Sequence, residues 1–176
     1  GTVMAPARPF VHESVLLDRV LELFAPVPAG TIVDATLGGA GHAAALLEAR
    51  SDLRILGLDQ DRDALAAVQA RLAPYGDRAE ATHARFDQLA TVVAAAGAAV
   101  QPIVGVLFDL GVSSPQLDRP ERGFSYRADG PLDMRQDRDR ARTADDLVNG
   151  GDVRELAAVL RDLGDERFAR RVAERI

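Results

Sequence analysis

The chain has 176 residues, 47% of them hydrophobic, and a formal net charge of −6 from 21 basic and 27 acidic side chains. The absence of cysteine excludes disulfides, thiolate metal ligands and a cysteine nucleophile, and no apolar run approaches the roughly 20 residues that span a bilayer. Because its start shows no signal-peptide pattern, we expect a cytoplasmic protein without membrane contact, and its acidic balance leaves the partner open.

A helix and a short buried strand are predicted for the first part of the chain. The apolar spacing of residues 15–24 is typical of a helix packed on a core, and Pro26 and Pro28 end it. His12, just ahead of this helix, is either a ligand contact or a cap. Residues 31–33 are β-branched and apolar, which predicts a buried strand that ends at Asp34.

A glycine-rich turn follows this strand and leads into a predicted helix over residues 43–50. Glycines at 38, 39 and 41 allow the backbone to approach a ligand, and the helix start would present N–H groups to it. A second apolar strand, residues 55–59, ends in Asp59, roughly 20 residues downstream, where an acid can accept hydrogen bonds from a ribose. The pair predicts a nucleoside-cofactor site, with a plain α/β turn as the alternative.

The kind of cofactor is indicated by the register of the glycines. A dinucleotide fingerprint that starts at Gly38 lacks its middle glycine, and one that starts at Gly39 fits only with alanine in its last position. Asp34, directly before the loop, suits a ligand with an ammonium group better than a pyrophosphate. The pattern favours the S-adenosylmethionine loop of class I methyltransferases. A nicotinamide-dependent oxidoreductase stays as an alternative, because Asp59 would serve its ribose equally well.

Two more strands are predicted beyond the second one. A helix capped by Asp61 is followed by a strand at residues 79–83 and by Phe86, which could cover an adenine or belong to the core. After a helix over residues 88–98, the apolar run 103–109 is typical of a strand in the middle of a parallel sheet, and it ends in Asp109. Ligands of such sheets bind beyond the carboxyl ends of the strands, where Asp34, Asp59 and Asp109 would all lie.

The character of the sequence changes after Leu117. Residues 118–142 are dense in Arg, Asp, Gly and Pro, which predicts a long substrate-binding loop or the entry to an inserted module. Helices are predicted for residues 144–149, 152–163 and 165–176. We therefore expect residues 1–117 to form a cofactor-binding core and residues 118–176 to begin a helical substrate-recognition module.

Several segments together give the chain a family resemblance. They are HESVLL at 12–17, DATLGGAGH at 34–42, DQD at 59–61, DLGVSSPQL at 109–117, RGFSY at 122–126, DGPLDMR at 129–135 and DERFARR at 165–171. With these segments the chain resembles the bacterial 16S ribosomal RNA cytosine-N4 methyltransferases, the small subunit methyltransferase H family. The resemblance implies an α/β, Rossmann-like class I methyltransferase sheet, here incomplete, with the start of a helical insertion. It also implies methyl transfer from S-adenosylmethionine to a cytidine amine in the decoding centre.

The resemblance assigns roles to particular residues and implies no metal site. Asp59 would hold the ribose, and Phe86 would lie against the adenosine. The methionine end of the cofactor would be lined by Ala40, Gly41 and His42, and the pocket would be completed by Asp109 and Gln116. The family's loop usually has glycine and serine where this chain has Ala40 and Ala43. Ala40 would add a methyl group where backbone approaches the ligand, so the affinity for the cofactor is expected to differ.

Catalysis is assigned to Asp109, which could accept a hydrogen bond from the weakly nucleophilic cytosine amine. The cytosine has to leave its stack, and Phe124 or Tyr126 is the expected contact. The family continues past residue 176, so we expect this chain to be its N-terminal part. The expected partner is 16S ribosomal RNA in the small subunit. A non-catalytic RNA- or protein-binding piece is the alternative from another functional class.

Overall fold

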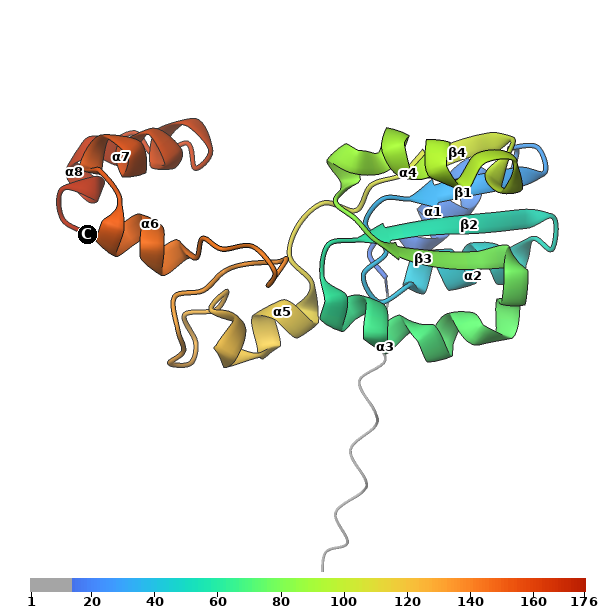
Figure 1. The fold of residues 1–176 in the computed structure, drawn as a ribbon, viewed down its shortest axis with the longest axis horizontal. Helices are drawn as coiled ribbons and strands as arrows, with labels where there is room; N and C mark the ends of the chain where they lie inside the picture. The colour runs from blue at the N-terminus through green and yellow to red at the C-terminus, as the bar shows by residue number, and fades with distance from the viewer. Residues whose placement is uncertain (1–13) are drawn as a thin grey trace, which may run out of the picture. The chain divides into compact units, whose positions relative to one another are not determined.

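The structure, a computed structural model, describes residues 14–176, which form two compact units divided between Asp109 and Leu110 (Figure 1). His12 lies outside the described residues. The predicted boundary between core and insertion, after residue 117, stays a prediction. Within residues 14–176, no helix combines the length and the apolar character that crossing a bilayer requires.

The first unit is built on a parallel sheet with the strand order β3-β2-β1-β4. The strands are β1 (Gly30–Asp34), β2 (Leu53–Asp59), β3 (Ala79–His83) and β4 (Ile103–Leu107). Val33 of β1 pairs with Leu56 on one side and with Val106 on the other. This parallel sheet with its flanking helices confirms the predicted α/β, Rossmann-like class.

Helices cover both faces of the sheet. Figure 1 shows α4 on one side and α2 and α3 on the other. The helices are α1 (Leu17–Phe24), α2 (Gly41–Ala49), α3 (Arg62–Leu72) and α4 (Leu89–Ala96), with short 3₁₀ turns at Ala73–Arg78, Phe86–Gln88 and Gly97–Val100. As predicted, Asp61 caps α3, where its side chain accepts from the Asp63 N–H.

The core of the first unit consists of two apolar clusters, one on each face of the sheet. Ile32 packs with Leu46 and Leu47 of α2, whereas the next residue, Val33, belongs to the cluster beneath α4 with Leu56 and Leu58. Successive side chains of a strand point to opposite faces. The unbroken apolar runs of β1 and β2 therefore supply both clusters.

β4 differs from its prediction. In the described residues it pairs only with β1 and is an edge strand, so its expected place in the middle of the sheet is wrong for this chain. Val106 is accordingly 41% exposed, and the strand ends at Leu107, two residues before Asp109. An apolar run shows that a strand is suited to burial on both faces, but it does not show which neighbours the strand has.

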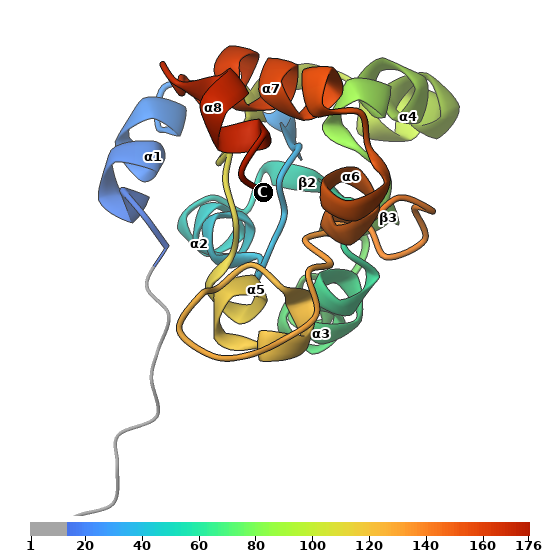
Figure 2. The same ribbon diagram turned by 90° about the vertical axis from the view of Figure 1, so that its left-hand side faces the viewer.

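The second unit is mostly short helices. They are α5 (Ser114–Asp118), a 3₁₀ turn at Pro120–Arg122, α6 (Ala144–Gly150), α7 (Val153–Asp162) and α8 (Ala169–Ala173). α7 and α8 lie side by side in Figure 1 and Figure 2 and bury Leu156, Ala157 and Ala173 between them and α6. The helix predicted for residues 165–176 is wrong in length, because Asp165 has a left-handed backbone (φ 51) and α8 begins only at Ala169.

Residues 118–142 contain little regular structure, and side-chain hydrogen bonds to the backbone stabilise their course. Arg122 is buried and donates to the carbonyl oxygens of Arg135, at 3.1 Å, and Gln136, at 3.2 Å. Asp133 forms a 2.8 Å ion pair with Arg135, which lowers the pKa of its carboxyl to about 2. Hydrogen bonds and an ion pair of arginine side chains therefore stabilise the conformation of this segment.

Candidate functional site

The glycine turn after β1 is joined to the end of β2 by Asp59. One carboxylate oxygen, Oδ2, accepts from the Gly38 N–H at 2.7 Å, and Oδ1 accepts from the Asp61 N–H at 2.8 Å. Burial raises the pKa of this carboxyl, and the two backbone N–H donors oppose that shift. A carboxylate oxygen can accept more than one hydrogen bond, so both oxygens keep capacity for a ligand hydroxyl. Asp59 thus connects the glycine turn to the end of β2, and its predicted ribose contact stays a prediction.

The ends of β1 and β4 are joined through Thr36. The Asp109 N–H donates to the Thr36 hydroxyl at 2.6 Å, and the Ala35 N–H donates to the Leu107 carbonyl at 2.9 Å. These bonds fix the backbone of Asp109 while its carboxylate stays half exposed. Sequence reasoning did not assign this role to Thr36, although a threonine two residues after a strand-end acid is a recognisable signal.

His42 is brought close to Asp109 at the start of α2. Its Nε2 lies 2.9 Å from the Val15 carbonyl oxygen, which can only accept, so Nε2 carries the proton in this arrangement. The other nitrogen, Nδ1, lies 4.0 Å from Asp109 Oδ2, within ion-pair distance when the ring is protonated. The ring is therefore oriented by the chain ahead of α1, a contact that the sequence did not predict.

Gly41 and Ala40 show why this turn has its composition. A Cβ at Gly41 would overlap the Ser14 hydroxyl, so a larger residue here would force that hydroxyl to turn away. Ala40 has a left-handed backbone (φ 55), is fully buried, and places its methyl group in the core beside Leu37 and Ala43. In this structure the methyl group is buried in the core. The predicted contact of Ala40 with a cofactor, and its expected effect on the affinity, stay predictions.

Asp34 is buried beneath the same turn. It is 2% exposed and accepts from the Thr36 N–H at 3.2 Å. Desolvation raises the pKa of its carboxyl to about 6, against the lowering effects of the Thr36 hydrogen bond and of His42. The Asp34 carboxyl presents almost no surface in this structure. The expectation of an ammonium partner for it stays a prediction.

Two aromatic rings meet near these acids. Phe86, in the turn after β3, and Phe108, just after β4, form an edge-to-face pair with centroids 6.1 Å apart and planes at 84°. Since β3 and β4 are the two outer strands of the described sheet, the contact joins the segments that follow its opposite edges. The sequence analysis considered Phe86 but missed Phe108, an aromatic directly before a strand-end acid.

The remaining predicted residues belong to the second unit. Gln116 is buried in α5. Its side-chain Oε1 accepts from the Ser113 N–H at 3.0 Å, and its backbone N–H donates to the Ser113 hydroxyl. Tyr126 is almost completely exposed, and Phe124 is half-buried. The roles predicted for these three residues in the pocket and on the cytosine stay predictions.

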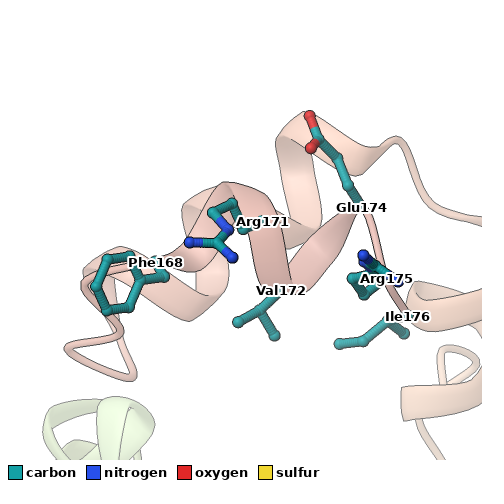
Figure 3. A pocket seen from close by; sticks show the side chains of 6 residues that line it. All are labelled: Phe168, Arg171, Val172, Glu174, Arg175 and Ile176. Atoms are coloured by element: carbon teal, nitrogen blue, oxygen red, sulfur yellow. The ribbon is translucent and has the colours of Figure 1, made fainter.

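The second unit also has a cavity of about 730 Å³ along α8. Its lining residues are Phe168, Arg171, Val172, Glu174, Arg175 and Ile176. Figure 3 shows the Arg171 guanidinium turned towards the Phe168 ring, with its carbon 5.8 Å from the ring centroid. An exposed aromatic ring can stack on a base of a single-stranded nucleic acid, and a guanidinium beside it can contact a phosphate.

A second hollow, of about 490 Å³, lies in the first unit between α2 and the end of α3. Gly41 lines it together with Arg71 and Tyr75. Neither hollow is lined by Asp59 or Asp109. The candidate site is therefore defined by the convergence of side chains at the strand ends.

The chain is similar to known proteins over most of its length. The model of the MraW methylase family matches residues 9–176. A protein of Mycolicibacterium smegmatis named ribosomal RNA small subunit methyltransferase H is 51% identical over 173 residues, covering 94% of this chain and 46% of that protein. Proteins of the same name from Frankia alni and Thermobifida fusca are 52% and 49% identical, with 94% of this chain covered and 52% and 50% of theirs.

The chain thus spans about half the length of the curated relatives it matches. The match to the family model nevertheless includes the glycine turn, the three strand-end acids and the whole second unit. On this evidence the chain belongs to the MraW methylase family.

Proposed function

We propose that this chain is the cofactor-binding part of an S-adenosylmethionine-dependent methyltransferase that acts on the N4 amine of a cytidine in 16S ribosomal RNA. One observation carries the proposal. In a chain of the MraW methylase family, Asp59 accepts a hydrogen bond from the Gly38 N–H. The acid that ends β2 is therefore fixed against the glycine turn that follows β1. Ligands of open α/β sheets bind beyond such strand ends.

The side chains at the strand ends have the chemistry that the parts of this cofactor require. Asp59 has acceptor capacity for ribose hydroxyls, and the half-exposed ring of Phe86 offers a flat surface for adenine. His42, Gly41 and the backbone of Ala40 would receive the methionine end, and Asp109 would complete the pocket. S-adenosylmethionine, when bound, supplies an electrophilic methyl group on a sulfonium.

Asp109 is the proposed catalytic residue. The lone pair of a cytosine amine is delocalised into the ring, and a carboxylate that accepts one of its N–H groups favours a localised lone pair. The amine loses one proton when it gains the methyl group, and the exposed Asp109 carboxylate is available to receive it. The hydrogen bond from its N–H to the Thr36 hydroxyl holds the Asp109 backbone in place. A fixed backbone helps to position the carboxylate against the amine, and such positioning lowers the barrier to methyl transfer.

The second unit is the proposed RNA-recognition part of the chain. Phe168 is exposed beside Arg171, and Arg175 lines the same cavity. Base stacking on aromatic rings and arginine contacts to phosphate are common in proteins that bind single-stranded RNA. This surface supports a ribosomal RNA partner in the small subunit despite the acidic net charge of the whole chain.

Family membership favours the methyltransferase over the nicotinamide-dependent oxidoreductase. Calorimetric titration of the 176-residue chain with S-adenosylmethionine tests the proposal, with Asp59→Ala as the site variant and Asp18→Ala, on the exposed face of α1, as the matched control. We expect saturable binding that Asp59→Ala loses and Asp18→Ala keeps. Folded wild-type chain that binds ribosomal RNA but no cofactor would contradict the proposal and support a purely RNA-binding role.

A second measurement addresses the reaction. Transfer of a labelled methyl group to small ribosomal subunits that lack this modification should depend on Asp109, and Asp109→Asn should lower the rate by a larger factor than it lowers the cofactor affinity. A rate unaffected by Asp109→Asn would remove Asp109 from the catalytic role.

A further inference from the structure

Phe108 occupies a position in the site that the proposed function leaves without a role. It stands between two residues whose backbones are fixed by hydrogen bonds from the neighbouring strand. The Leu107 carbonyl accepts from the Ala35 N–H, and the Asp109 N–H donates to Thr36. The Cα of Phe108 is therefore anchored on both sides, which limits where its ring can lie.

The partner ring is anchored in a similar way. Ahead of Phe86, the Ala84 N–H donates to the Asp59 carbonyl at 3.0 Å, which ties this segment to the end of β2. Behind it, the Gln88 N–H donates to the Arg85 carbonyl at 2.9 Å and closes the short 3₁₀ turn. The backbones that carry the two rings are therefore both held by hydrogen bonds where the rings meet edge to face.

Core packing does not explain this ring pair. Phe86 is 45% exposed and Phe108 is 48% exposed, and neither belongs to the apolar clusters of the first unit. Phenylalanine gains most of its stabilising effect from burial, which these two positions provide only in part. In an edge-to-face pair, the contact itself covers one face of one ring and neither face of the other.

We propose that Phe108 is a positioning residue for the purine base of the nucleoside cofactor, because its contact holds the Phe86 ring in the orientation that receives the base. This inference rests on the proposed function and adds a residue to it. A half-exposed phenylalanine without such a neighbour would move between rotamers and would have to be ordered when the ligand binds. Phe108 orders the ring in advance.

A double-mutant cycle on the 176-residue chain tests the inference. The affinity of S-adenosylhomocysteine, the stable product of methyl transfer, is measured by calorimetry for wild-type, Phe108→Leu, Phe86→Leu and the double variant. An aromatic pair contributes enough that Phe108→Leu should weaken binding by about threefold to tenfold. If Phe108 acts through Phe86, the same substitution should change the affinity by less than about twofold when Phe86 is already leucine.

Two further variants separate positioning from a loss of structure. Phe108→Tyr keeps the ring and should retain the wild-type affinity, which a substitution that merely disturbs β4 would not do. Leu23→Ala shortens an exposed apolar side chain on α1, in the first unit, and should leave the affinity unchanged. Thermal unfolding followed by circular dichroism checks that each variant is folded. If Phe108→Leu does not fold, Phe108→Met replaces it in the cycle.

The outcomes distinguish this inference from the proposed function. An unchanged affinity in Phe108→Leu, or independent effects of the two substitutions that multiply in the double variant, overturns the role of Phe108 and leaves the methyltransferase proposal intact. A folded wild-type chain that does not bind S-adenosylhomocysteine overturns both. Coupled losses at the two rings, with recovery in Phe108→Tyr, support the inference.

Discussion

The two compact units of this chain are stabilised by different kinds of contact. In the first unit the strands β1 and β2 are almost wholly buried, and apolar side chains such as Ile32 and Leu58 fill both faces of the sheet. In the second unit the apolar cluster around Leu156 is smaller, and the buried side chains also include Arg122 and Gln116, which hydrogen-bond to backbone groups. Apolar burial is non-directional, whereas hydrogen bonds depend on geometry, so the two units respond differently to substitution.

A buried ionisable side chain from each unit illustrates the contrast. Asp34 lies in the apolar unit, and burial raises the pKa of its carboxyl to about 6. Arg122 lies in the polar unit and is 3% exposed, with its guanidinium directed at two carbonyl oxygens. A buried charge is costly unless hydrogen bonds compensate it. Burial therefore disfavours the charged form of Asp34. The charge of Arg122 is compensated by hydrogen bonds to two carbonyl oxygens.

The largest effect should come from truncating the apolar core. Leu58 is fully buried in the cluster beneath α4, and Leu58→Ala should lower the free energy of unfolding by about 3 to 4 kcal/mol through lost burial and a residual cavity. Urea unfolding followed by circular dichroism measures this change. Leu163→Ala, at an exposed leucine of the second unit, is the control and should cost less than about 0.5 kcal/mol. Equal effects at the two leucines would contradict the comparison.

The buried carboxyl of the first unit should make stability depend on pH. The native pKa of Asp34, about 6, lies above the ordinary value of 3.8, so between these values the native state holds a proton that the unfolded chain has released. Stability from this group is present at low pH and is lost as the pH rises through that window. Asp34→Asn removes the loss and should be more stable than wild-type by about 2 to 3 kcal/mol above the window.

Urea unfolding of both proteins at several pH values measures this difference. We expect the advantage of Asp34→Asn to shrink towards acidic pH. An advantage that stays constant with pH would show that the carboxyl titrates normally.

The polar unit should be most sensitive at Arg122. Arg122→Ala leaves the Arg135 and Gln136 carbonyl oxygens without this donor and should destabilise residues 118–142 by about 2 kcal/mol. Chymotryptic cleavage within this segment should become about tenfold faster or more, because local opening becomes more frequent. Arg127→Ala, at an exposed arginine of the same segment, should leave cleavage unchanged. Increased hydrogen exchange in β1 and β2 would mean that the two units are not stabilised separately.

The smallest effect should come from Ala40→Gly. Glycine relieves the left-handed backbone at this position, but it also removes a fully buried methyl group. These effects oppose each other, so the free energy of unfolding should change by less than about 1 kcal/mol. Ala43→Gly makes the same change at a fully buried alanine inside α2, where there is no strain to relieve, and should cost clearly more. Similar losses at both positions would show that Ala40 is unstrained.

Local patterns in the sequence predicted most of the elements. The four strands, the cap of α3 and the helices over 144–149 and 152–163 follow from short-range periodicity, turn residues and capping residues, which act within one or two turns of chain. The three acids of the site could also be predicted, because Asp34, Asp59 and Asp109 each follow an apolar run. Parallel strands bring their carboxyl ends to one edge, so their convergence needs no knowledge of strand order.

Tertiary structure alone decided the features that depend on residues far apart in sequence. β4 pairs only with β1 and is therefore an edge strand of the described sheet. The methyl group of Ala40 is buried in the core, and the Phe108 ring contacts the Phe86 ring, which follows the opposite edge strand. His42 found its acceptor in Val15, 27 residues earlier. A sequence pattern specifies which face of an element is apolar or polar, but the partner of that face is selected by packing in three dimensions.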